Sequence, residues 1–214
     1  MVSNIEEIRT IRLLSNLKDN ELNDIAKILL EKKYRDGQYI FRQDDSDPRI
    51  FFVKKGKVKI TISNDQGREV GLAVMGSGDF FGELSVLTGM DRSADVIAVE
   101  DCELYILSGN DFNRHVLNNS GLIYELAKEL ALRVRKSTSK IAEIALLDVV
   151  DRIYHTLIDL GMDPDGKAWF KRPTQSDIAS MVGTSREMVT RGLKVLEEVK
   201  RIEIKGKEVR ALKN

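Results

Sequence analysis

Cysteine and histidine are scarce in this chain. Its 214 residues include a single cysteine, Cys102, and two histidines, His115 and His155. One cysteine cannot form an internal disulfide, and these three residues lack the spacing of a zinc or iron–sulfur site. We therefore expect a buried structural thiol and no metal. No pairing of a nucleophile with a base emerges either, so an enzyme is not expected.

Long hydrophobic runs are missing as well. No segment approaches about 18 uninterrupted apolar residues, and Met1 to Arg12 mixes Glu and Arg with apolar residues, unlike a signal peptide. These features predict a cytoplasmic protein that does not engage a membrane. The hydrophobic content of 42% over this length is enough for two modest domains, each with its own core.

A net charge is also lacking, but the charges are unevenly spread. The 34 Lys and Arg balance the 34 Asp and Glu, yet Gly166 to Asn214 holds 12 basic and 6 acidic residues, a net of +6 that leaves −6 for the rest. A basic end on an acidic body indicates that one end of the chain meets phosphate.

The pattern of the chain changes near Lys32. Before this residue, apolar residues at near-helical spacing predict two short helices that cap the next part of the chain. From Lys32 to about Leu107, short runs of Val, Ile, Phe and Tyr alternate with turns, which is typical of an antiparallel sandwich or barrel. Polar and apolar residues alternate from Lys57 to Ile62, which predicts a strand with one solvent-exposed face and one buried face. The turns are Asp36-Gly37, Lys55-Gly56, Asp65-Gln66-Gly67 and Gly76-Ser77-Gly78-Asp79.

One long helix is predicted from Asn110 to about Leu146. Its apolar positions step by four and three residues, a heptad seam that predicts a parallel dimer. The alternative is that this stripe packs on the chain's own barrel. One seam position is polar, Ser137, followed by Thr138, so a hydroxyl there needs a partner such as water, a helical carbonyl or a ligand. The seam positions are Ile123, Ala127, Leu130, Val134, Ser137, Ile141 and Ile144.

The last part of the chain predicts a helix-turn-helix. Asp148 can cap one helix, and Thr174 with Asp177 can cap another. Ser176 to Met181 forms a short helix, Val182-Gly183-Thr184 a tight turn, and Ser185 to Glu198 a second helix with Met188 or Val189, Leu193 and Leu196 on its apolar face. An ordinary helical hairpin is the alternative. Arg201 to Leu212 alternates around Gly206 as a β-hairpin would.

The start of the second helix carries the side chains expected to read DNA. Arg can bridge guanine O6 and N7, and Glu can accept from cytosine N4. Lys171, Arg172, Lys194 and Lys200 are placed for phosphate contacts. The predicted DNA-binding residues are Thr174, Ser185, Arg186, Glu187, Thr190, Arg191 and Lys194.

A candidate small-molecule site lies within the predicted barrel. Gly82-Glu83-Leu84-Ser85 is followed, nine residues after Glu83, by Arg92-Ser93-Ala94. A loop that turns at Gly82 can present free backbone N–H groups, while Arg92 suits a phosphate and Glu83 can accept from ribose hydroxyls. Taken alone, a Glu and an Arg at this spacing would more often form a structural salt bridge.

These residues carry a resemblance to a known family. Phe80 to Ser85 with Arg92-Ser93-Ala94 resembles the phosphate-binding cassette of cyclic-nucleotide-binding domains. Gly183 to Arg191 resembles the recognition helix of bacterial catabolite activator (cyclic-AMP receptor) proteins, and Ser137-Thr138 falls where that family uses a Thr-Ser pair. The order of parts matches from about Ser15 to Lys213, so the chain is identified as a member of the catabolite activator and fumarate–nitrate regulator superfamily.

The resemblance implies an α+β fold in three parts. Residues 1–109 would form a jelly-roll, cyclic-nucleotide-binding-like β-barrel with N-terminal helices. Residues 110–147 would form the dimerisation helix and hinge, and residues 148–214 a winged helix-turn-helix domain. A two-state homodimer would respond to ligand through the hinge near Leu146 to Val149, bind palindromic DNA, and touch RNA polymerase through the loop Gly161 to Gly166.

The resemblance also implies residue roles at the ligand. Glu83 would hold the ribose, Arg92 and Ser93 the cyclic phosphate, and Gly82 would add a backbone contact, with Leu84, Ser85 and Ala94 completing the cassette. Ser137 of one subunit and Thr138 of its partner would reach the adenine of cyclic AMP. Arg186, Glu187 and Arg191 would read a half-site resembling TGTGA.

Alternatives to cyclic AMP control stay open at the level of sequence. Ala73 stands where the cyclic-AMP receptor has a serine near the purine, and the Glu-to-Arg spacing is one residue shorter, so cyclic GMP or another small ligand is an alternative. A ligand-independent DNA-binding protein, whose barrel serves only dimerisation or partner docking, is a second. A regulatory subunit or channel sensor does not explain the basic end of the chain.

Overall fold

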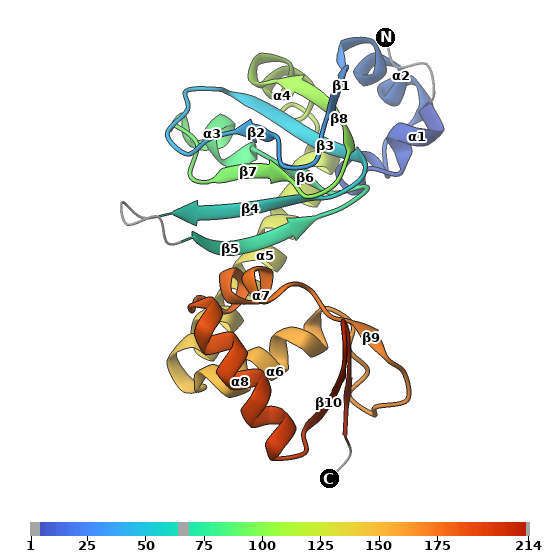
Figure 1. The fold of residues 1–214 in the computed structure, drawn as a ribbon. Coiled ribbons are helices and arrows are strands. Elements are labelled where there is room, and N and C mark those ends of the chain that lie inside the picture. The colour runs from blue at the N-terminus through green and yellow to red at the C-terminus, as the bar shows by residue number, and fades with distance from the viewer. Residues whose placement is uncertain (1–4, 64–68, 213–214) are drawn as a thin grey trace. The chain divides into compact units, whose positions relative to one another are not determined.

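The computed structural model describes residues 5–63 and 69–212, and the predicted turn Asp65-Gln66-Gly67 lies outside them. The chain divides into two compact units, residues 1–63 with 72–133 and residues 64–71 with 134–214. Figure 1 labels most of the helices and strands of both units. The three-part division at residues 109 and 147 stays a prediction.

Two antiparallel four-stranded sheets form the first unit. Their strand orders are β1-β8-β3-β6 and β2-β7-β4-β5. The strands are Leu30–Tyr34 (β1), Tyr39–Phe41 (β2), Arg49–Lys55 (β3), Val58–Ser63 (β4), Glu69–Met75 (β5), Phe80–Phe81 (β6), Asp95–Ala98 (β7) and Cys102–Ser108 (β8). The predicted antiparallel β-structure from Lys32 to Leu107 is confirmed.

The middle of strand β3, Ile50 to Val53, is a run of four buried apolar residues because both faces of its sheet are covered. Successive side chains of a strand point to opposite faces. Phe51 and Val53 belong to a core built from both sheets, whereas Ile50 and Phe52 belong to a second core that also takes in the N-terminal helices. These helices are α1 (Ile5–Arg9), the 3-10 helix η1 (Arg12–Leu14) and α2 (Asp19–Ile28), and they cap the barrel as predicted.

The alternation predicted for residues 57–62 fails in the second half of strand β4. Val58 is fully buried and Ile60 is partly buried, as expected. Beyond them, Thr61 is fully buried and Ile62 is exposed. Periodicity locates a strand correctly, but which of its residues are covered depends on neighbouring elements that the local pattern does not contain.

The prediction of one uninterrupted helix from Asn110 to Leu146 is wrong. The segment forms α4 (Gly109–His115) and α5 (Ser120–Leu146). The Asn119 side chain accepts the backbone N–H groups of Gly121 and Leu122 at 3.0 and 3.2 Å, and such a side chain caps the start of a new helix. Phe112 of α4 and Leu122 of α5 are buried in the core of the first unit.

The second unit contains the predicted helix-turn-helix and wing. Its helices are α6 (Val149–Asp159), α7 (Gln175–Val182) and α8 (Arg186–Glu198), and its strands β9 (Phe170–Lys171), β10 (Ile202–Lys205) and β11 (Glu208–Ala211) form a sheet of order β10-β11-β9. Asp148 caps α6 by accepting the N–H of Asp151 at 2.9 Å, as predicted. The hairpin turns at Gly206, which has a positive φ of 61°.

Helices α6 and α8 approach closely at a glycine. A Cβ placed on Gly192 would lie 2.5 Å from Cδ1 of Ile153. A methyl group at this position would require the end of the Ile153 side chain to move, and Ile153, Leu193 and Leu196 share one core. Among the described helices, none is long and apolar enough to cross a membrane.

Candidate functional site

The predicted cassette begins at a helix start rather than in an open loop. Gly82 has a left-handed φ of 84° and precedes α3 (Glu83–Thr88), a helix that the sequence pattern did not predict. A side chain at Gly82 would clash, because its Cβ would lie 2.7 Å from Arg92 Nη1 and 2.8 Å from the carbonyl oxygen of Arg49. Glycine is thus required both by the turn and by the close approach of Arg92.

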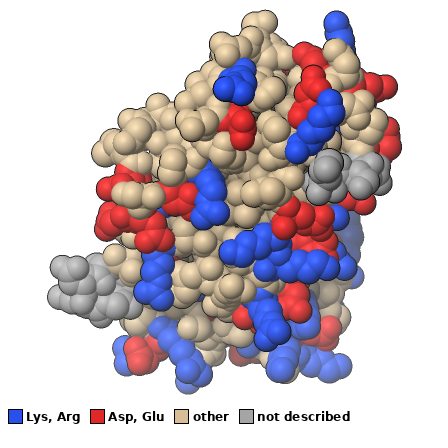
Figure 2. Space-filling model, turned by 90° about the horizontal axis from the view of Figure 1, so that it is seen from above, with Lys and Arg blue, Asp and Glu red and all other residues tan. Residues whose placement is uncertain are grey.

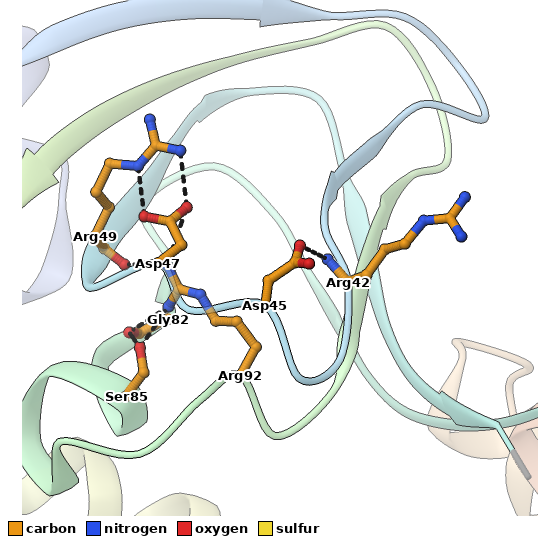
Figure 3. Close-up of polar contacts among 7 residues, drawn as sticks. All are labelled: Arg42, Asp45, Asp47, Arg49, Gly82, Ser85 and Arg92. Carbon is orange, nitrogen blue, oxygen red and sulfur yellow. Dashed lines mark hydrogen bonds and ion pairs between the residues drawn. The ribbon is translucent and has the colours of Figure 1, made fainter.

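Arg92 is the centre of this cluster and is almost fully buried, with 2% of its surface exposed. Nη1 donates to the carbonyl oxygen of Gly82 and to Ser85 Oγ, both at 2.8 Å, and Nη2 donates to the carbonyl oxygen of Arg49 at 2.7 Å. Figure 3 shows the guanidinium reaching toward these groups. Its Nε is buried and has no hydrogen-bond partner among the described residues.

A second arginine and one carboxylate surround Arg92. The guanidinium of Arg49 donates two hydrogen bonds of 2.6 and 2.8 Å to the carboxylate of Asp47. Nη2 of Arg92 lies 3.6 Å from the same carboxylate. Burial acts to raise the pKa of Asp47, but the hydrogen bonds and charges of the two arginines lower it overall. Burial lowers the pKa of Arg92, against the effect of Asp47. The site therefore holds two guanidinium groups and one shared carboxylate.

Glu83 pairs with a residue that the sequence pattern did not reveal. Its carboxylate is 4% exposed and accepts a hydrogen bond of 2.9 Å from Nη1 of Arg133 on α5. Nη2 of Arg133 donates to the carbonyl oxygen of Phe80 at 2.5 Å, and the guanidinium lies over the Phe80 ring. The structural salt bridge considered for Glu83 and Arg92 is thus made with Arg133 instead. No motif signals this pair, because its members are 50 residues apart.

The other cassette residues divide into buried and exposed ones. Ser85 and Ala94 are buried, whereas Leu84 and Ser93 are exposed. An open groove of about 250 Å³ borders the cluster through Arg49 and Ser85 but is not lined by Glu83 or Arg92. The structure brings Gly82, Ser85 and Arg92 into direct contact.

The predicted seam of α5 is largely exposed. Ile123, Val134 and Ile141 expose 42%, 64% and 68% of their surface. Leu130 is partly buried against the core of the first unit, as the alternative interpretation expected for the whole stripe. Ser137 and Thr138 are exposed, and the Thr138 hydroxyl donates to the carbonyl oxygen of Val134 at 3.0 Å. This helical carbonyl is one of the partners expected for a hydroxyl at this point of the helix.

Helix α7 has the cap and the turn that the sequence predicts, and α8 has a cap that was not predicted. Thr174 and Asp177 form a capping box, Gly183 ends α7 with φ of 73°, and Ser185 caps α8 by accepting the N–H of Met188 at 3.3 Å. Of the two apolar candidates near the start of α8, Val189 is buried and Met188 is exposed. This choice fixes which face of α8 packs on the core.

Five of the seven residues predicted to bind DNA share the exposed face of α8. Arg186, Glu187, Thr190, Arg191 and Lys194 are all exposed. Lys194 is 3.8 Å from Glu198, a weak surface pair that leaves the ammonium available. On the face of the molecule drawn in Figure 2, by contrast, basic and acidic side chains lie side by side.

The loop predicted to meet RNA polymerase is only partly exposed. Met162 is buried in the core of the second unit, whereas Pro164 and Asp165 are exposed. The Asp163 side chain accepts the backbone N–H groups of Asp165 and Lys167 at 2.9 and 3.2 Å, which orders the turn. The exposed surface of this loop is therefore its tip, together with Gly161 at its start.

Two family models match this chain. The cyclic nucleotide-binding domain model matches residues 31–119, and the Crp-like helix-turn-helix domain model matches residues 151–213. The first match contains the Gly82 to Arg92 cluster, and the second contains α7 and α8.

Curated relatives and solved structures agree with these matches. The cAMP-activated global transcriptional regulator Vfr of Pseudomonas aeruginosa is 38% identical over 198 residues, 87% of this chain and 92% of Vfr. The cAMP-activated regulator CRP of Escherichia coli O6:H1 is 32% identical over 182 residues, 83% of this chain and 87% of CRP.

Among solved structures, the c-di-GMP responsive regulator CLP of Xanthomonas campestris has a TM-score of 0.79 and 26% identity, covering 92% of this chain and 100% of that chain. The Thermus thermophilus catabolite activator protein has a TM-score of 0.57 and 28% identity, covering 94% and 93%.

Proposed function

The chain belongs to the CRP/FNR family of cyclic-nucleotide-responsive, DNA-binding transcription regulators, and from that premise we propose that cyclic AMP controls its binding, as a homodimer, to palindromic DNA. The observation that carries the ligand half of this proposal is the Nε of Arg92, which is buried and unpaired among the described residues. A buried donor without a partner costs free energy that an acceptor from a ligand would recover.

Arg92 is suited to bind the cyclic phosphate. Both N–H groups of Nη1 are engaged, and one N–H of Nη2 donates to the carbonyl oxygen of Arg49. The other N–H of Nη2 is left over, because Asp47 at 3.6 Å is beyond hydrogen-bond distance, and Nε has no partner in the described part of the chain. Nε and Nη2 form one edge of the guanidinium fork, and such an edge binds a phosphate through two parallel hydrogen bonds. Ser93, which is exposed beside Arg92, would add a hydroxyl.

Glu83 would accept hydrogen bonds from the ribose hydroxyls, held in place by Arg133. Gly82, Leu84, Ser85 and Ala94 shape the turn around these two charged groups. Because Arg133 neutralises the Glu83 carboxylate, a negatively charged ligand can approach it without net repulsion. Arg133 is thus a positioning residue that we add to the predicted set.

Ser137 and Thr138 would recognise the purine, and cyclic AMP is favoured by the relatives Vfr and CRP, both named as cAMP-activated. A second candidate is a different nucleotide, because the structural neighbour CLP is described as c-di-GMP responsive. Both candidates place a phosphate at Arg92, so they differ in what meets the α5 hydroxyls.

The exposed seam of α5 supports the homodimer. A helix that exposes Ile123, Val134, Ile141 and Ile144 along one heptad stripe leaves apolar surface in water unless a second helix covers it. Two copies related by a twofold axis would present two α8 helices, which is why the DNA site would be a palindrome with half-sites one helical turn, about 34 Å, apart. RNA polymerase would meet the tip of the loop at residues 161–166.

The test is fluorescence anisotropy of a labelled palindrome with TGTGA half-sites, titrated without ligand and with cyclic AMP, cyclic GMP or c-di-GMP at fixed salt. Of these four conditions, we expect only cyclic AMP to give tight binding of the chain to the duplex. Arg92→Leu should abolish this response, and Arg92→Lys, which keeps the charge but loses the fork, should restore it in part. Tight binding that no nucleotide changes, in the parent and in Arg92→Leu alike, would establish the ligand-independent alternative.

A further inference from the structure

We propose that Arg49 is a positioning residue of the nucleotide site, which keeps the carboxylate of Asp47 away from the edge of Arg92 that would bind the phosphate. This inference rests on the proposed binding of a cyclic nucleotide by Arg92. Asp47 precedes strand β3, and Arg49 is the first residue of that strand. Sequence reasoning assigned neither residue a role.

The carboxylate of Asp47 has an arginine on each side but is hydrogen-bonded to only one of them. Nε and Nη2 of Arg49 donate to its two oxygens at 2.6 and 2.8 Å, as Figure 3 shows. Nη2 of Arg92 lies 3.6 Å from the same carboxylate. Because a hydrogen bond from a guanidinium to a carboxylate is about 2.7–2.9 Å long, a shift of less than about 1 Å would bring Asp47 into contact with Arg92.

Asp47 and a phosphate would compete for the same donors of Arg92. Nη2 of Arg92 has one N–H left over, and its Nε has no partner among the described residues. A carboxylate accepts from this edge of a guanidinium in the same bidentate way as a phosphate does. The side chains of Arg92 and Asp47 are only 2% and 19% exposed, so water would screen an ion pair between them weakly. A ligand would have to break that pair before it could bind.

Arg49 is the stronger of the two partners of Asp47. Burial acts to raise the pKa of Asp47, but this pKa is lowered overall, and the hydrogen bonds and charge of Arg49 contribute more to the lowering than Arg92 does. Asp47 is therefore an anion at neutral pH, and Arg92 would attract it if Arg49 were absent. The carbonyl oxygen of Arg49 also accepts from Arg92 at 2.7 Å. Arg49 thus holds Arg92 with its main chain and Asp47 with its side chain.

The first experiment is isothermal titration of the full, nucleotide-free chain with cyclic AMP. Arg49→Met should weaken binding about tenfold, the effect of a hydrogen bond between charged groups that the ligand must break. Asp47→Asn in the Arg49→Met background should restore the affinity to within about twofold of the parent, because the competing anion is gone. Arg49→Lys, which can still bind the carboxylate through one contact, should recover part of the affinity.

Arg42→Met is the matched control for the loss of one positive charge. The guanidinium of Arg42 lies over the ring of Tyr39, 4.4 Å from its centroid, and points away from Arg92 in Figure 3. This variant should bind cyclic AMP as the parent does. Parent-like circular dichroism and urea midpoints verify that each variant is folded.

The second experiment observes Arg92 without any ligand. The Nε–H signal of Arg92 is identified in a nitrogen–proton correlation spectrum by its loss in Arg92→Lys. In ligand-free Arg49→Met this signal should shift, because Asp47 then accepts from Arg92. In the Asp47→Asn, Arg49→Met double variant it should return to the position of the parent. A change in overall charge alone would not move the signal in this pattern.

Four results would overturn the inference. Arg49→Met could bind cyclic AMP as the parent does, or the double variant could stay as weak as Arg49→Met, which would mean that Arg49 itself touches the ligand. Asp47→Asn alone could weaken binding, which would mean that Asp47 supports Arg92 and does not compete for it. The Arg92 signal could also be unchanged in Arg49→Met. A parent that binds none of cyclic AMP, cyclic GMP and c-di-GMP would refute the proposed function and, with it, this inference.

Discussion

Replacement of Arg133 by methionine tests the ion pair that the sequence did not reveal. The change removes a guanidinium that binds Glu83 and the carbonyl oxygen of Phe80, while the methionine keeps much of the apolar stem. What remains is a carboxylate with 4% exposure and no counterion from α5. We expect both the stability of the first unit and its affinity for nucleotide to fall.

The size of the effect depends on burial. Removing one partner of a fully buried ion pair costs about 3–5 kcal/mol, because the other charge is left desolvated. Here the Arg133 side chain is 27% exposed, so water already screens part of the interaction. A loss of about 1–3 kcal/mol is therefore expected. Glu83→Gln in the Arg133→Met background removes the stranded charge and should recover part of this loss.

Hydrogen exchange of strands β3 and β8 measures this effect, because these strands lie in the core of the first unit. Isothermal titration with cyclic AMP measures affinity, which should fall about tenfold, roughly 1.4 kcal/mol. Arg135→Met, two residues along α5 and exposed, is the matched control and should change neither quantity. Parent-like protection and affinity in Arg133→Met would show that the ion pair contributes nothing and would refute the reasoning.

Three further predictions concern packing and titration. Gly192→Ala should leave the free energy of unfolding nearly unchanged, because the gain in helix propensity offsets a contact with the flexible end of Ile153. Gly192→Val should lower that free energy by about 2 kcal/mol, measured by urea unfolding followed by Trp169 fluorescence. A Gly192→Val variant as stable as the parent would contradict the close approach of the two helices. Burial and its hydrogen bond to a carboxylate raise the pKa of Tyr105 to about 12. The folded state then holds a proton that the unfolded state loses near pH 10, so stability should fall between pH 10 and 12, and this fall should be smaller in Tyr105→Phe. Burial and neighbouring acids raise the pKa of Cys102. Iodoacetamide should therefore modify this thiol at least about ten times more slowly in the folded chain than in urea. Equal modification rates in the two states would contradict the burial of Cys102.

Local chemistry in the sequence predicted the elements and their caps well. Asp148 and Thr174 cap the helices that the pattern places after them, since a cap depends on a side chain and a backbone N–H only a few residues apart. The resemblance added the order of the parts and the position of the cassette, which periodicity alone does not supply.

Contacts between distant segments were beyond the sequence. Thr61 has the pattern of a wet strand position and is buried, and the break between α4 and α5 interrupts a pattern that local spacing continues. Arg49 and Asp47 surround Arg92 although 43 residues separate the two arginines. Such pairs form because the fold brings them together, so no spacing rule points to them.

Helix α5 explains why the missed residue matters for the proposed response. Leu122 and Leu126 bury one face of this helix in the core of the first unit, and Arg133 binds Glu83 one turn beyond Leu130. The adjacent residue, Val134, belongs to the exposed seam. A ligand that accepts from Arg92 and approaches Glu83 would therefore act on a residue beside the surface where a second copy would pack. Ligand binding and dimer geometry would then be linked through neighbouring residues of α5, and by reciprocity a variant that stabilises one dimer arrangement should also raise nucleotide affinity.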